Sequence, residues 1–302
     1  MKSDNLKESR NIEDRRGQSY SQSSGNSNLG GGILQILLSP GSFKSKIIII
    51  LLMVLLGGGA SLGGLFGNGT SQPYQSTQVT RTNKTHVDDA DAQFVSKVLA
   101  TTEDHWHKVF QAEGRTYQEP KLVFYTGRTK TGCGVGQASA GPFYCPTDKK
   151  IYLDMSFYKE LTTKYKASGD FAMAYVIAHE VGHHVQNELG ILGKYHRMQQ
   201  GLSEKERNAI SVRIELQADY LAGVWARSIQ DRNLLDIGDI EEAMNAAHAV
   251  GDDTLQEQAY GYSVPDSFTH GTSEQRMRWF KRGYQYGDLQ HGDTFSLSDS
   301  EL

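Results

Sequence analysis

The amino-acid sequence predicts an α+β domain with a small, mostly antiparallel sheet and a helical lower half, preceded by one transmembrane helix. Two short runs rich in β-forming residues, Lys121–Tyr125 and Lys150–Leu153, lie between segments of helical periodicity. From about residue 168 onward the pattern is helical, which separates the strands from the longer helices along the chain. Before the domain, residues 47–66 form an uncharged apolar run, long enough to cross about 30 Å of hydrocarbon as a helix.

The apolar run decides where the rest of the chain is expected to lie. Its second half is rich in glycine, and the alternative interpretation is a buried or signal-type segment. Lysine and arginine residues precede it at positions 2, 7, 10, 15, 16, 44 and 46. Lysine and arginine residues that flank a transmembrane helix favour the cytoplasmic side. We therefore expect a single-pass membrane protein with its N-terminus in the cytoplasm and its domain on the extracytoplasmic side.

Composition predicts how the chain is divided. Residues 1–46 are polar and rich in Ser, Gly and Asn, which predicts a disordered cytoplasmic tail. Residues 67–88 have the composition of a flexible tether between membrane and domain. The domain then spans residues 89–287, and the polar, acidic residues 288–302 are expected to form a disordered tail.

The helices of the domain are predicted from apolar periodicity and from their end signals. Ser203 and Glu206 form a capping box, and Gly190 stands where a helix would end. Helices are therefore expected over residues 94–110, 170–189 and 203–225, with shorter ones starting near residues 239 and 273. The glycine-rich residues 131–141 lack the strand–turn–helix context of a phosphate-binding loop, so we interpret them as a loop.

Charge and cysteine content exclude several classes of function. The chain of 302 residues has a formal net charge of −4 and a pI near 6.2, which gives no basic surface for nucleic acid. Cys133 and Cys145 are too few for a four-cysteine metal site. They form a disulfide if the domain is extracytoplasmic; the alternative is two reduced thiols. Any metal must therefore be held mainly by histidines and carboxylates.

The strongest chemical signal is His179-Glu-Val-Gly-His183, an HExxH pattern in the middle of a predicted helix. Residues four apart point to nearly the same side of a helix, so His179 and His183 can hold one metal ion. Glu180 lies beside them and can accept a proton from a water without being a ligand. His184 lies roughly 140° around the helix from His179 and is given no metal role. The alternative interpretation is a pair of hydrogen-bonded core histidines.

A third ligand is predicted at Glu215, in the segment Glu215-Leu-Gln-Ala-Asp219. Glu215 can complete a site of two histidines and one glutamate, and Asp219, four residues later on the same face, can accept the outer N–H of a liganding histidine. A solvated acidic pair is the alternative, although the neighbouring residues are small and apolar. A histidine third ligand at metzincin spacing is excluded, because Gln186 and Leu189 stand where it requires a glycine and a histidine.

These motifs together resemble a known family. HEVGHHVQ followed by ELQADYLAG is similar to the bacterial neutral zinc metallopeptidases, within the wider zincins that use a glutamate as third ligand. The resemblance extends from Asn11-Ile-Glu-Asp-Arg-Arg through the apolar run and KIYLD to His270-Gly-Thr-Ser-Glu-Gln-Arg276. It implies a zincin-like fold, one Zn²⁺ per chain and a peptide or protein substrate. In a bacterium, the extracytoplasmic side expected from the flanking charge is the periplasmic side of the cell membrane.

Two further residues are expected in the site from this resemblance. Related zincins pair an extended substrate with an edge strand above the metal, and KIYLD around Tyr152 is the matching position. Similar peptidases place a histidine after the glutamate-bearing helix to stabilise the oxyanion, which His270 matches. An ordinary loop histidine is the alternative for His270, because Thr272 and Gln275 form a capping box just after it.

The function expected from these residues is zinc-dependent peptide hydrolysis with Glu180 as the general base. Two alternatives use the same site. One is a catalytically silent zinc-binding envelope protein that acts through protein partners, and the other is a zinc hydrolase of a non-peptide amide or ester. The sequence does not indicate an oligomeric state.

Overall fold

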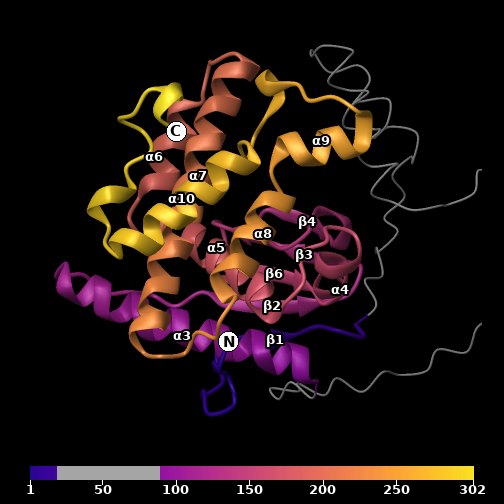
Figure 1. The fold of residues 1–302 in the computed structure, drawn as a ribbon, viewed down its shortest axis with the longest axis vertical. Coiled ribbons are helices and arrows are strands. Elements are labelled where there is room, and N and C mark those ends of the chain that lie inside the picture. Colours follow the sequence, from indigo (N-terminus) through magenta and orange to yellow (C-terminus); the bar gives the residue numbers. More distant parts are fainter. Residues whose placement is uncertain (19–88) are drawn as a thin grey trace, which may run out of the picture. The chain divides into compact units, whose positions relative to one another are not determined.

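The structure is a computed structural model that describes residues 1–18 and 89–302 (Figure 1). The predicted transmembrane helix over residues 47–66 and the predicted tether over residues 67–88 lie outside the described residues. No helix within the two described ranges is long and apolar enough to cross a membrane.

A four-stranded sheet forms one side of the domain. Its strands are β1 (Ile12–Asp14), β2 (Lys121–Tyr125), β5 (Phe143–Cys145) and β6 (Lys150–Asp154). They lie in the order β1-β2-β6-β5. A separate two-stranded hairpin consists of β3 (Arg128–Thr131) and β4 (Gly134–Gln137).

The α+β class is correct, but the prediction of a mostly antiparallel sheet is wrong. Strand β1 runs parallel to β2, and β2 runs parallel to β6; only β5 is antiparallel to its neighbour β6. The two β-rich runs visible in the sequence are β2 and β6. Their periodicity does not show whether the two strands run parallel or antiparallel. The connection between them is long enough for a parallel crossover, because it also contains the hairpin and β5.

Helices make up most of the domain. They are α3 (Ala90–Ala112), α4 (Ser156–Thr163), α5 (Asp170–Glu188), α6 (Ile191–Met198), α7 (Glu204–Asp231), α8 (Asp239–Ala249), α9 (Asp252–Tyr260) and α10 (Ser273–Tyr286). Helix α3 lies below the sheet in Figure 1, with α7 and α10 above it. Helix α5 contacts α3, α7 and α8 and is buried around most of its circumference, so it is the central element of the core.

A disulfide joins Cys133, in the turn between β3 and β4, to Cys145 at the end of β5. The pairing considered from the sequence is therefore confirmed. It fixes the hairpin against β5, the strand at one edge of the sheet.

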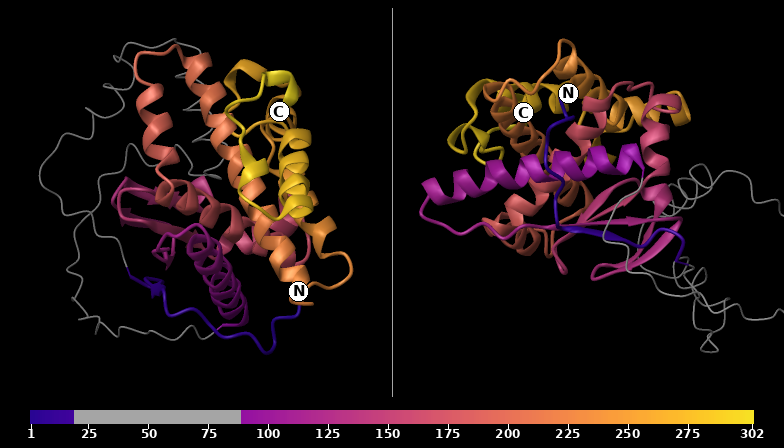
Figure 2. Two further views of the ribbon diagram at one scale, coloured as in Figure 1. Left: turned by 90° about the vertical axis from the view of Figure 1, so that its left-hand side faces the viewer. Right: turned by 90° about the horizontal axis from the view of Figure 1, so that it is seen from below.

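Residues 1–17 were predicted to belong to a disordered tail, and this prediction is wrong. They cross α3 and add β1 to the sheet, as the indigo segment in Figure 2 shows. On the way, Ser9 Oγ and Asn11 Nδ2 both donate hydrogen bonds to the buried carboxylate of Glu103, at 2.6 and 2.9 Å. Farther along, Lys150 Nζ lies 2.8 Å from Glu13. Several of its polar side chains thus have polar partners on the domain, so a polar composition does not require disorder here.

Residues 288–302 were also predicted to be a disordered tail, and this too is wrong. They pack along α7 and α10, with Thr294 and Leu302 buried. The guanidinium of Arg213 on α7 donates hydrogen bonds to the carbonyl oxygens of Thr294 and Leu297. Backbone carbonyls, which no composition measure reports, hold this segment in place.

Helices α7 and α10 approach closely where two glycines meet. A Cβ on Gly223 would lie 2.0 Å from the carbonyl oxygen of Phe280, and one on Gly283 would lie 1.9 Å from that of Tyr220. Backbone packs directly on backbone at this crossing, so any side chain would force the helices apart.

We predict that Gly223→Ala destabilises the domain by about 3 kcal/mol or more, because neither backbone can yield. Gly193→Ala is the matched control, since a Cβ there meets only the end of the Arg197 side chain at 3.5 Å. It should stabilise helix α6 by up to about 1 kcal/mol. Thermal denaturation of both variants measures the difference, and similar melting temperatures would contradict the packing described.

Candidate metal centre

Three side chains with the chemistry of zinc ligands converge between α5 and α7. His179 and His183 are one turn apart on α5, with ring centroids separated by 4.8 Å. Glu215 reaches them from α7, with Oε2 3.1 Å from His179 Nε2 and Oε1 3.5 Å from His183 Nε2. The three ligand atoms all lie within 4.8 Å of one another. The structure thus brings together the three residues that the sequence predicts as ligands.

The closeness of the two helices depends on Gly182. A Cβ at this position would lie 2.9 Å from the carbonyl oxygen of Ala218 and 3.2 Å from its Cα. Gly182 directly precedes His183, and Ala218 lies about one turn after Glu215. The glycine in the HExxH segment is therefore what allows a glutamate of α7 to reach the histidines of α5.

His179 is held by the buried carboxylate of Asp219, as predicted. The Nδ1–H of His179 donates to Asp219 Oδ1 at 2.8 Å, which leaves Nε2 free to face Glu215. The same carboxylate accepts from the hydroxyl of Tyr175 at 2.6 Å and from Arg276 Nε at 2.8 Å and Nη2 at 3.0 Å. Asp219 thus has three separate partners.

The pKa values follow from this arrangement of buried charges. Burial favours the neutral form of Asp219, but Arg276 and His179 outweigh it and lower the pKa to about 2. Burial likewise disfavours a charged His179, yet Asp219 and Glu215 raise its pKa above the usual range. For Glu215, burial is again outweighed, here by His183 and His270, which lower its pKa. The two carboxylates stay ionised and attract a cation to the imidazoles.

Arg276 is one of the functional residues that were not predicted from the sequence. It appears at the end of the segment His270–Arg276, but no role was assigned to it. It is almost fully buried on α10, and a buried guanidinium needs a carboxylate. The apolar residues Trp279 and Phe280 on the same helix were a usable signal, because they place this face of α10 in the core.

His183 has a second, different partner. Its Nδ1 lies 3.0 Å from Oε1 of Gln186 on the same helix, so the Nδ1–H donates and Nε2 faces Glu215. The neighbouring carboxylate of Glu180 is buried and makes no hydrogen bond with any side chain in the described parts of the chain. Glu180 therefore remains available to a reactant.

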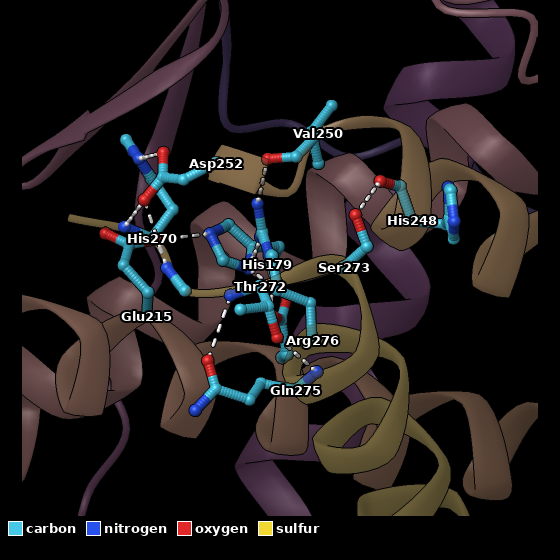
Figure 3. Close-up of polar contacts among 12 residues, drawn as sticks. His179, Glu215, His248, Val250, Asp252, His270, Thr272, Ser273, Gln275 and Arg276 are labelled. Carbon is cyan, nitrogen blue, oxygen red and sulfur yellow. Dashed lines mark hydrogen bonds and ion pairs between the residues drawn. The ribbon is translucent and has the colours of Figure 1, made fainter. Parts of the chain in front are cut away.

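His270 lies near Glu215, on the loop before α10 (Figure 3). Its Nδ1 pairs with Asp252 Oδ1 at 3.2 Å, while Asp252 Oδ2 accepts the backbone N–H groups of Thr269 and His270, both at 2.6 Å. The side chain of His270 is half exposed. The oxyanion role of His270 stays a prediction. The contact with Asp252, which fixes the ring, was not foreseen.

The prediction that Tyr152 lies on a substrate-binding edge strand is wrong. Tyr152 is buried in β6, which lies between β2 and β5, and its hydroxyl donates to Asp148 at 2.6 Å. The edge strand nearest α5 is β5. The resemblance matched this role to KIYLD, and the three residues of β5 are too few to show a strand periodicity in the sequence.

His184, which was given no metal role, connects this edge strand to α5. Its Nε2–H donates to the carbonyl oxygen of Gln118 at 2.5 Å, and its Nδ1 accepts from the hydroxyl of Tyr144 at 3.0 Å. That hydroxyl also accepts from Asn187 Nδ2 at 3.0 Å. The ring thus fixes β5 beside the helix that carries the ligands.

The donor set fits zinc. Two imidazole nitrogens and one carboxylate oxygen converge with both outer histidine nitrogens already hydrogen-bonded, as in three-ligand catalytic zinc sites. A second acidic group of Asp170, Asp239 and Glu242 also has metal-binding geometry. There the amino group of Met1 lies 3.0 Å from Asp170 and 3.2 Å from Asp239, so a cation is already present.

Comparison with known proteins supports the same chemistry. The sequence model of a family described as "Putative neutral zinc metallopeptidase" matches residues 1–295. "Uncharacterized protein YpfJ" of Escherichia coli K12 is 50% identical over 292 residues, which cover 97% of this chain and 98% of that protein. "Uncharacterized protein Rv2575" of Mycobacterium tuberculosis H37Rv is 44% identical over 194 residues, covering 61% of this chain and 64% of that protein. No solved structure matches the chain.

We predict that Glu215→Ala abolishes tight zinc binding, because two histidines remain and one anionic ligand is lost. Metal analysis of the purified variant after dialysis measures the effect. Glu204→Ala is the matched control, an exposed glutamate in the first turn of the same helix that should leave the zinc content unchanged. Stoichiometric zinc in Glu215→Ala would exclude this residue as a ligand.

Proposed function

Because the chain belongs to the family described as "Putative neutral zinc metallopeptidase", we propose that it is a zinc-dependent hydrolase that cleaves peptide bonds. The observation that carries the proposal is the position of Glu180. It follows His179 directly on the helix that supplies two of three converging ligand atoms, and its buried carboxylate accepts no hydrogen bond from any described side chain.

The chain's own residues account for the steps of hydrolysis. When bound, zinc supplies a Lewis acid that lowers the pKa of a water and polarises a carbonyl group. Glu180 accepts the proton of the attacking water and passes it to the leaving nitrogen. Asp219 and Gln186 keep the Nδ1 atoms of the two histidines protonated, so that both Nε2 atoms stay directed into the site.

Two further features suit a peptide substrate. His270, held by Asp252, is positioned near Glu215 where it can donate a hydrogen bond to a developing oxyanion. Strand β5 lies at an edge of the sheet and is fixed to α5 through Tyr144 and His184. An extended peptide can add to such an edge through its backbone, which favours a peptide over a small amide or ester.

We predict that Glu180→Gln retains zinc but lowers peptide turnover at least about 100-fold, because the amide cannot accept the proton. Zinc content and cleavage of a broad peptide library, read by mass spectrometry, measure the two effects. Glu188→Gln near the end of the same helix is the matched control, since that carboxylate pairs with Lys149 at 2.8 Å.

The alternatives give different results in the same assay. Full activity of Glu180→Gln would refute the proposed mechanism. Zinc binding without cleavage by the wild-type protein would favour a silent zinc-binding protein. Cleavage of ester or amide substrates but not of peptides would favour a non-peptide hydrolase.

For localisation we propose that the domain is extracytoplasmic, because the pairing of Cys133 with Cys145 suits an oxidising compartment. We further propose that residues 1–17 lie on the same side of the membrane as the domain. Strand β1 hydrogen-bonds directly to β2, and Asn11 bonds to Glu103, neither of which is possible across a bilayer. This differs from the topology expected from flanking charge, which places the N-terminus in the cytoplasm.

A cross-linking experiment tests the shared location. Lys7 Nζ lies 2.7 Å from Asp104 Oδ1, and both side chains are accessible. We predict that the double variant Lys7→Cys/Asp104→Cys is cross-linked within one chain by a short, membrane-impermeant bismaleimide added to intact spheroplasts. The native cysteines do not react because they are paired. Each single variant serves as a control.

The outcomes are distinct on a denaturing gel. An intrachain product supports the proposal. A cross-linked dimer would show that β1 is exchanged between chains. No product in spheroplasts, but a product after lysis, would place at least one of the two positions in the cytoplasm.

A further inference from the structure

Two buried glutamines connect a metal ligand to the C-terminal tail. Oε1 of Gln186 accepts from His183 Nδ1 at 3.0 Å. Nε2 of Gln186 donates to Oε1 of Gln217 on α7 at 3.1 Å, and Nε2 of Gln217 donates to the carbonyl oxygen of Gly292 at 2.9 Å. Gln186 is fully buried and Gln217 nearly so, so water cannot replace these partners freely.

This chain of hydrogen bonds has a fixed direction. The carbonyl oxygen of Gly292 can only accept, so Gln217 must present its amide nitrogen to it and its oxygen to Gln186. Gln186 must then present its nitrogen to Gln217 and its oxygen to His183. A ring nitrogen that faces an amide oxygen must carry the proton, which leaves the lone pair on Nε2 for the metal.

Gln186 also sets the spacing of the two ligand-bearing helices. Its Nε2 donates a second hydrogen bond, at 2.8 Å, to the carbonyl oxygen of Ile214, the residue before Glu215. One side chain therefore contacts the ligand His183 on α5 and the backbone next to the ligand Glu215 on α7. Loss of this side chain would free both ligands.

The backbone carbonyl of Gly292, where this series of hydrogen bonds ends, is held in a fixed position. A Cβ on Gly292 would lie 2.6 Å from the ring of Tyr220, so only glycine can bring this carbonyl so close to α7. Two residues later, the buried hydroxyl of Thr294 donates to the carbonyl oxygen of Arg213 at 2.7 Å. The tail is therefore anchored to α7 on both sides of Gln217.

We propose that Gln186 and Gln217 are positioning residues that transmit the fixed orientation of the Gly292 carbonyl to His183. They hold the ring as its Nδ1–H tautomer, with Nε2 directed at the metal. The C-terminal tail is then part of the support of the metal centre, and its docking raises the affinity for zinc. This inference rests on the proposed zinc site.

Zinc affinity of the purified full-length protein, measured by competition with a fluorescent chelator, tests the proposal. Gln186→Leu should weaken zinc binding about 10- to 100-fold, and Gln217→Leu should weaken it by a smaller factor. Gln186→Glu should also weaken zinc binding, because its carboxylate can accept from His183 but cannot donate to the carbonyl oxygen of Ile214 or to Oε1 of Gln217. The ¹⁵N NMR signals of His183 in the zinc-loaded protein should shift in Gln217→Leu, although this side chain does not touch the ring.

A second glutamine gives a matched control. Nε2 of Gln199 donates to the carbonyl oxygen of Arg207 and to Ser211 Oγ, both at 3.1 Å, and so also joins a helix end to α7, but it has no link to His183. Gln199→Leu should lower the melting temperature of the metal-free protein without changing the zinc affinity.

Three results would overturn the proposal. Wild-type zinc affinity in both Gln186→Leu and Gln217→Leu would remove the positioning role while leaving the zinc site intact. An equal loss of affinity in Gln199→Leu would show a general effect of stability. Failure of the wild-type protein to bind zinc would refute the proposed site and this inference together.

Discussion

The close crossing of α5 and α7 is the constraint on which the metal centre depends. Two histidines one turn apart can face one ion wherever a helix carries them, but a third ligand must come from elsewhere. Here it comes from a helix whose backbone lies against Gly182. Side chains that bridge the two helices, Gln186 to Ile214 and His179 to Asp219, then fix their relative rotation. A larger residue at position 182 would separate all of these pairs at once.

Charge balance explains why so many ionisable groups can be buried together. A divalent ion and Arg276 bring three positive charges, and the carboxylates of Glu180, Glu215 and Asp219 bring three negative ones. The formal charges therefore cancel when the site is loaded. In the metal-free protein the balance is restored in part by protons, which is why the pKa of His179 is raised. Burial of this set would be costly with any one member missing. Arg276 thus belongs to the site as much as the ligands do, although it touches no ion.

The part of the site that the sequence predicted is the part set by helix geometry. His179, His183 and Glu180 follow from positions on one helix, and Asp219 follows from its spacing to Glu215. Arg276 and Gln217 could not be found in this way, because their partners are far along the chain; Asp219 lies 57 residues from Arg276. The same limit applies to the sheet. Strand patterns indicated β2 and β6, but neighbour order and direction depend on β1 and β5, which are three residues each and carry little periodicity.

Both ends of the described chain show how composition can mislead about order. A segment poor in apolar residues is expected to stay disordered, because it buries too little surface to offset its loss of conformational entropy. The N-terminal strand and the C-terminal tail gain their stability differently, by satisfying polar groups that are already buried in the domain. Glu103 accepts from Asn11, and Gln217 donates to Gly292. Removing either segment leaves such groups without partners, at a cost of about 1–3 kcal/mol for each group. A fragment limited to residues 89–287 would therefore retain every proposed ligand and still lack a sheet edge and the support of His183. The unit that folds around the metal site includes both polar ends.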